Sequence, residues 1–163
     1  MPDSGHILVV CTGNICRSPM AEGLLKHALA GQPAPLRSLR VISAGVATRS
    51  GEPVSENAVI ALKKAGIDIA GHRSHSLTQA MLDDALVVLG MTESHRSIIQ
   101  MKAMPVPKNL HLFREFMPAA AEKEIGDPYG GPLKVYEATR DEMVEAIPSV
   151  LDFLKTLIIR PGA

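Results

Sequence analysis

The chain is poor in aromatic residues and in cysteine, and it has no excess of charge of either sign. Only 3% of its 163 residues are aromatic, and none is tryptophan. The 17 basic and 17 acidic side chains give a formal net charge of zero, which offers no general attraction for nucleic acid or an anionic membrane. No apolar run approaches the roughly 20 residues of a membrane-spanning helix. We therefore expect no nucleic-acid partner and no membrane partner.

Cysteine occurs only at Cys11 and Cys16. This pair does not resemble the disulfide framework of a secreted domain. It is also too small for a structural zinc site, because no histidines at ligand spacing complete it. Residues 1–6 lack the basic segment of a signal peptide, and the apolar run after them is short. We expect a cytoplasmic protein without a bound metal.

Apolar residues, at 46% of the chain, are numerous enough for a buried core, and we expect a single domain over residues 1–163. Apolar runs predict four strands, and stretches of helical periodicity separate them. This alternation predicts a three-layer α/β domain. The strands are expected at 7–11, 39–43, 85–91 and 109–113, and the helices after Ser18 and at 54–65, 77–83, 92–104 and 132–157. Pro148 is expected to kink or split the last helix, and residues 116–126 to form a loop with a possible helical turn.

The stretch from Cys11 to Ser18 lies between the first strand and the first helix. Ser18 is a suitable N-cap and Pro19 a suitable first helical residue. A helix N-terminus attracts anions, and a cysteine there is placed to react as a thiolate. The planar guanidinium of Arg17 can bind two phosphate oxygens at once. Gly13 and Asn14 are residue types that tolerate the left-handed backbone of a loop wrapped around an anion.

The run Val10-Cys11-Thr12-Gly13-Asn14-Ile15-Cys16-Arg17-Ser18-Pro19-Met20-Ala21-Glu22 closely resembles the signature of the low-molecular-weight protein-tyrosine phosphatases. The resemblance implies a four-stranded parallel sheet flanked by helices, with a phosphate loop after the first strand. It implies that Cys11 attacks phosphorus and forms a phosphocysteine, and that Arg17 stabilises the charge. Phosphate would be bound by residues Thr12, Gly13, Asn14, Ile15, Cys16 and Ser18, and Ser18 would also donate a hydrogen bond to the thiolate. No cofactor is expected, because the loop itself supplies the positive charge.

The sequence Asp127-Pro128-Tyr129-Gly130-Gly131 also matches the family. By itself, an Asp-Pro pair most often marks a turn, but the resemblance implies that Asp127 is the general acid and base. Tyr129 would form a wall of the substrate cleft. Ser43 and His72 match positions that brace Asn14, although His75 is an equally plausible partner on local grounds.

The substrate is the open question. Residues 46–51 lack the aromatic residue that often accompanies phosphotyrosine selectivity, and later stretches resemble the bacterial branch that includes protein-arginine phosphatases. Those members carry Thr where this chain has Ile15, whose methyl groups suit a phenyl ring better than a guanidinium. We expect phosphotyrosine on a protein substrate, with phosphoarginine as the alternative.

Two further functions are less well supported. An arsenate reductase needs more cysteines than two for its relay. The hypothesis of a non-catalytic anion-binding module does not explain why Cys11, Arg17, Ser18 and Asp127 are all present. Cys16 either fills space or, as the resemblance suggests, forms a reversible disulfide with Cys11. The sequence does not predict an oligomeric state.

Overall fold

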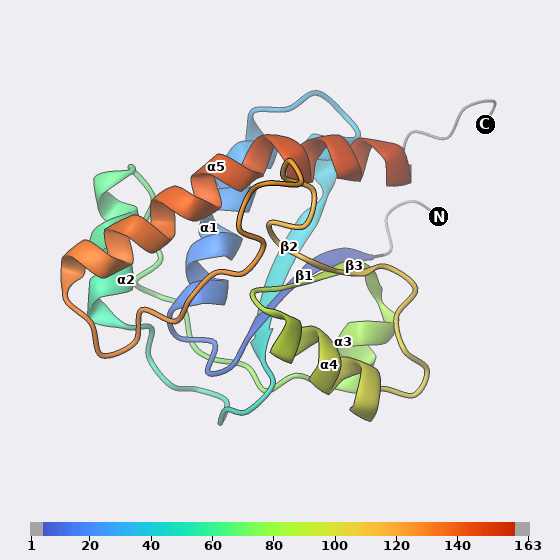
Figure 1. Ribbon diagram of the computed structural model, residues 1–163, viewed down its shortest axis with the longest axis horizontal. Helices are drawn as coiled ribbons and strands as arrows, with labels where there is room; N and C mark the ends of the chain where they lie inside the picture. Colours follow the sequence, from blue (N-terminus) through green and yellow to red (C-terminus); the bar gives the residue numbers. More distant parts are fainter. Residues whose placement is uncertain (1–4, 159–163) are drawn as a thin grey trace.

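A parallel sheet of four strands forms the centre of the computed structural model, which describes residues 5–158 (Figure 1). The strands are β1 (His6–Cys11), β2 (Arg40–Gly45), β3 (Ala85–Gly90) and β4 (Leu110–Leu112), in the order β2-β1-β3-β4. Strand β1 pairs with both β2 and β3, and every one of its residues is buried. The predicted four-stranded parallel sheet is confirmed.

Helices cover both faces of this sheet, which explains why β1 is apolar without alternation. Ile7 and Val9 face the side covered by α1 (Arg17–Ala30), α2 (Glu56–Lys64) and α5 (Leu133–Ile158). Leu8 and Val10 face the side covered by α3 (Gln79–Asp83) and α4 (Glu93–Lys102). A short 3-10 helix, η1 (Leu36–Ser38), precedes β2. Figure 1 shows α5 crossing α1 and α2 on one side of the molecule, with α3 and α4 on the other.

The predicted elements agree with the observed ones apart from their ends. Gly66, with φ of +81°, follows α2 in the left-handed conformation that ends many helices. Helix α5 continues through Pro148, so the prediction of a split is wrong. Residues 116–126 contain turns but no helix. Among residues 5–158, no helix is both long and apolar enough to cross a membrane.

Candidate active site

Cys11 is the last residue of β1 and is 2% exposed. The chain then turns through residues 12–16, and α1 begins at Arg17 with Cys16 in the N-cap position. The prediction that Ser18 caps this helix is therefore wrong, as is the placement of Pro19 at its first residue. The tight loop already reaches helical geometry at Arg17, which puts Pro19 in the third position. A proline is tolerated there because the first-turn N–H groups lack partners within the helix.

Two hydrogen-bond donors converge on the sulfur of Cys11. The Ser18 hydroxyl lies 3.0 Å from Sγ, and the Asn14 main-chain N–H donates to Sγ over 3.2 Å. The Ser18 oxygen accepts a hydrogen bond from Asn14 Nδ2 at 2.7 Å, so its own proton is available to the sulfur. Donors of this kind favour a negatively charged sulfur, the nucleophilic form of cysteine.

Asn14 is buried and holds the loop in shape. Its φ is +56°, in the left-handed region, whereas Gly13 does not have a positive φ. Its amide donates to Ser43 Oγ at 2.9 Å and accepts from the His75 main-chain N–H at 2.8 Å. The main-chain carbonyl oxygen of Asn14 lies 2.9 Å from His72 Nε2. This nitrogen must carry the proton, because a carbonyl can only accept. Ser43 and His72 thus both contact Asn14, and His75 does so through its backbone and not its ring.

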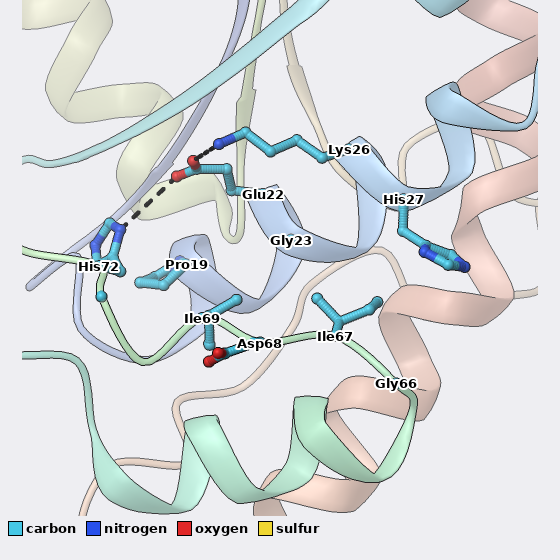
Figure 2. A pocket seen from close by; sticks show the side chains of 11 residues that line it. Pro19, Glu22, Gly23, Lys26, His27, Gly66, Ile67, Asp68, Ile69 and His72 are labelled. Atoms are coloured by element: carbon cyan, nitrogen blue, oxygen red, sulfur yellow. Dashed lines mark hydrogen bonds and ion pairs between the residues drawn. The ribbon is translucent and has the colours of Figure 1, made fainter.

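Glu22 extends this network behind the loop. Its carboxylate accepts from Ser43 Oγ at 2.5 Å. It also pairs with Lys26 at 2.5 Å, and His72 Nδ1 lies 3.9 Å away (Figure 2). Burial lowers the pKa of His72 despite the nearby carboxylate, which leaves the ring neutral at pH 7. Glu22 was not predicted from the sequence as a site residue, although its position four residues after Ser18 places both on one helix face.

These Glu22 and His72 side chains also border a pocket of about 530 Å³ between α1 and residues 66–72 (Figure 2). Ile67 and Ile69 form part of its wall, and neither Cys11 nor Asp127 lines it. Ile69 packs closely on α1, because a Cβ added at Gly23 would lie 2.8 Å from its Cγ2. This pocket therefore lies outside the cleft that Cys11 lines.

The end of β2 packs directly on the loop. A Cβ at Gly45 would lie 2.6 Å from the Thr12 carbonyl oxygen, closer than real contacts allow. The next two residues bond to the loop as well, with Val46 N donating to Cys11 O at 2.9 Å and Ala47 N to Thr12 O at 3.0 Å. Glycine is required at position 45 for this close approach.

The Arg17 guanidinium is anchored to a main-chain carbonyl on one side and faces Asp127 on the other. Its guanidinium donates to the Ile125 carbonyl at 2.9 Å, and a second nitrogen lies 3.6 Å from Asp127 Oδ2. The Arg17 side chain is 6% exposed and that of Asp127 is 52% exposed. An ion pair this long and this exposed on one side contributes little stability, so Asp127 can exchange Arg17 for a substrate group at small cost.

The loop that carries Asp127 is shaped by its own residues. Asp127 Oδ1 accepts from the Tyr129 main-chain N–H at 3.1 Å, which forms an Asx turn. Gly131 N donates to Pro128 O at 2.9 Å, and Gly130 between them has φ of +80°. Tyr129 is 69% exposed. Asp127 is therefore held at the edge of the cleft while Tyr129 remains open to solvent.

A cavity of about 200 Å³ joins these groups above the sulfur. Residues from both ends of the chain line it: the predicted nucleophile Cys11, the predicted phosphate-binding Arg17, the predicted acid Asp127 and the predicted wall residue Tyr129. Its lining consists of Cys11, Thr12, Gly13, Ile15, Cys16, Arg17, Asp127 and Tyr129. Asn14, Ser18, Ser43 and His72 lie behind this surface and act on the loop from within.

His95, at the start of α4, reaches the loop from the other face of the sheet. Its Nε2 lies 2.9 Å from Thr12 Oγ1, and its Nδ1 accepts from the Thr92 main-chain N–H at 3.2 Å. Burial, and then the Arg17 cation, lower the pKa of His95 to about 4. His95 was not predicted from the sequence as a site residue; the Thr92-x-x-His95 spacing at a helix start is the local signal that indicates its position.

Cys16 is buried below the cavity, and its thiol contacts Tyr136 on α5. Sγ lies 3.3 Å from the Tyr136 hydroxyl, which in turn accepts from Ser55 Oγ at 2.9 Å. Burial raises the pKa of the Cys16 thiol. Cys11 and Cys16 are both free thiols here. Within the described range, no group of three or more His, Cys, Asp or Glu side chains could hold a metal ion.

Comparisons with known proteins agree with this geometry. A sequence model of the family described as "Low molecular weight phosphotyrosine protein phosphatase" matches residues 6–157. The chain is 38% identical over 151 residues to a protein-arginine-phosphatase of Geobacillus stearothermophilus, covering 93% of this chain and 97% of the relative. It is 39% identical over 131 residues to the probable low molecular weight protein-tyrosine-phosphatase EpsP of Ralstonia solanacearum, covering 80% and 83%. The crystal structure of a low molecular weight protein tyrosine phosphatase from T. tengcongensis matches with a TM-score of 0.82 and 38% identity, covering 92% of this chain and 99% of that one.

Proposed function

Because the chain belongs to the low molecular weight phosphotyrosine protein phosphatase family of phosphomonoester hydrolases, we propose that it hydrolyses phosphotyrosine in protein substrates. Cys11 is the nucleophile. Its sulfur forms a bond to phosphorus as the bond from phosphorus to the tyrosine oxygen breaks, and water then hydrolyses the phosphocysteine. The observation that supports this proposal most directly is that Cys11, Arg17 and Asp127 line the same cavity.

Charge on the transferring phosphoryl group is stabilised by Arg17 and by loop residues Thr12, Gly13, Asn14, Ile15, Cys16 and Ser18. Phosphoryl transfer depends mainly on positioning and on stabilising the equatorial oxygens. The anchor from Arg17 to the Ile125 carbonyl supports this role, since it orients the guanidinium before substrate binds. The Ser18 hydroxyl stabilises the thiolate in the free enzyme and again as it leaves the phosphocysteine.

Asp127 serves both chemical steps. Its carboxyl group protonates the tyrosine oxygen as that oxygen leaves, and the resulting carboxylate then takes a proton from the attacking water. Its half-exposed position at the cleft, opposite the buried Arg17, supports this role. Ser43 and His72 act indirectly by bracing Asn14.

The choice of phosphotyrosine rests on the walls of the cleft. Ile15 and Tyr129 both line the cavity, and they present methyl groups and a ring to a substrate that enters it. A phenyl ring gains from such apolar contact, whereas a guanidinium loses hydration without finding a polar partner on Ile15.

Phosphoarginine is the second candidate. The similarity to two protein-arginine-phosphatases, at 38% and 34% identity, supports it. An arsenate reductase is disfavoured because Cys11 and Cys16 are the whole cysteine complement. We further propose that residues 1–163 form one phosphatase domain, and that the protein works in the cytoplasm, where a thiol nucleophile stays reduced.

The test is a steady-state assay on matched phosphotyrosine and phosphoarginine peptides. We expect a higher kcat/KM for phosphotyrosine, no turnover by C11S, and a much lower kcat for D127N. Preference for phosphoarginine would overturn the substrate assignment and leave the nucleophile intact. Hydrolysis by C11S equal to that of the parent would overturn the mechanism.

A further inference from the structure

His95 is tied to the substrate cleft through one residue. His95 is 2% exposed, and its ring contacts Thr12, which lines the cavity next to Cys11. The base of its side chain lies tightly against the end of β3, because a Cβ at Gly90 would be 3.2 Å from His95 Cβ. The ring is therefore held on a rigid part of the fold and not on a mobile loop.

The hydrogen bonds on either side of the ring determine which nitrogen carries the proton. Nδ1 accepts from the main-chain N–H of Thr92, so Nδ1 is unprotonated. The proton of the neutral ring is then on Nε2, which donates to Thr12 Oγ1 over 2.9 Å. The lowered pKa of His95 keeps the ring in this neutral form at physiological pH.

The Thr12 hydroxyl is oriented as a consequence. With His95 donating to its oxygen, its own proton must be directed toward another acceptor, and Thr12 is exposed to the cleft. We propose that His95 is a positioning residue, which orients the Thr12 hydroxyl as a hydrogen-bond donor to the phosphoryl group bound above Cys11. This inference rests on the proposed function, in which a phosphoryl group occupies that cavity.

Two substitutions separate this role from the part that His95 plays in capping α4. In H95N the amide oxygen can replace Nδ1 and keep the bond from Thr92, but no donor reaches Thr12. In H95Q the amide nitrogen can replace Nε2 and keep the bond to Thr12, while the cap is lost. A purely structural role predicts that activity follows stability and that H95Q is the weaker enzyme.

The experiment measures the affinity for inorganic phosphate by calorimetry, the kcat/KM on a phosphotyrosine peptide, and the Tm of each variant. We expect H95N and T12V each to lose about tenfold in phosphate affinity and in kcat/KM, the loss typical of one hydrogen bond to a charged group. We expect H95Q to retain more of both than H95N, although its Tm is lower. In the T12V background, H95N should cause no further loss, because His95 acts through Thr12.

Phosphate affinity in H95N equal to or above that in H95Q would overturn the inference, as would a full additional loss from H95N in the T12V background. Failure of the proposed function has a different signature, namely a parent protein that hydrolyses no phosphopeptide. The phosphate affinities of the variants would still decide the inference in that case.

Discussion

At the scale of single residues, Asn14 connects the loop to its surroundings through five hydrogen bonds. Its main chain donates to the Cys11 sulfur, its amide bonds to Ser18 and Ser43, and its carbonyl accepts from His72. It adopts φ of +56°, which asparagine tolerates better than most residues. The loop thus depends on one side chain both for its conformation and for its connection to β2.

Replacing Asn14 separates these two contributions. N14G and N14A both lose the amide hydrogen bonds, and both should reduce kcat at least tenfold because the buried donors and acceptors around the loop lose their partners. In addition, the free energy of unfolding of N14A, measured in urea, should be about 1 kcal/mol lower than that of N14G, since alanine disfavours a positive φ. The control is N57A, which removes one long bond of 3.4 Å to Gly131 O and should leave kcat unchanged. Equal stability of N14A and N14G would contradict the conformational argument.

At the scale of elements, the segment from β4 to the Asp127 loop is held in place by Arg114. This residue is buried, and it donates to Glu122 O at 2.7 Å and to Glu142 O on α5 at 2.6 Å. The same segment supplies the Ile125 carbonyl that anchors Arg17, and Ile125 N donates to Met91 O at 2.9 Å. A segment without regular structure is thereby fixed between α5 and β3.

Loss of the Arg114 guanidinium should therefore affect both stability and catalysis. R114M removes two hydrogen bonds that a buried guanidinium donates to main-chain carbonyls, and we expect a loss of about 3 kcal/mol in the free energy of unfolding, measured in urea. We expect kcat to fall as well, because the Ile125 carbonyl is then no longer held in place to anchor the Arg17 guanidinium. The exposed residue Arg37 offers a control, since R37M should change neither quantity by a measurable amount. Unchanged kcat in a folded R114M protein would show that the segment positions Arg17 without Arg114.

Local patterns predicted the strand, loop and helix around Cys11, because each depends on neighbours in sequence. The same patterns misplaced the start of α1, since Ser18 binds the Cys11 sulfur and not a helix N–H. The hydrogen bonds that Arg17 donates to the Ile125 carbonyl and that join His95 to Thr12 connect residues far apart in sequence. No periodicity or capping pattern records such contacts, so the residues that complete the site became evident only in three dimensions.

At the scale of the whole molecule, two buried histidines and one half-buried histidine make stability depend on pH. Burial lowers the pKa of His6, His72 and His95 from the ordinary value of 6.5, in the case of His95 to about 4. Each is neutral in the folded protein and takes up a proton more readily when the chain unfolds. Between pH 6.5 and 4 the unfolded state binds more protons, so the free energy of unfolding should rise with pH across this range.

We expect the free energy of unfolding, measured in urea at a series of pH values, to be highest above pH 7 and to fall steadily toward pH 4. The His95 shift alone corresponds to a loss on the order of 3 kcal/mol. H95N supplies the control, because asparagine does not titrate and can keep the cap on α4. Its stability should fall less steeply than that of the parent, with His6 and His72 responsible for the remaining slope. A parent protein equally stable at pH 7.5 and pH 4.5 would show that these histidines are protonated as easily in the fold as in the unfolded chain.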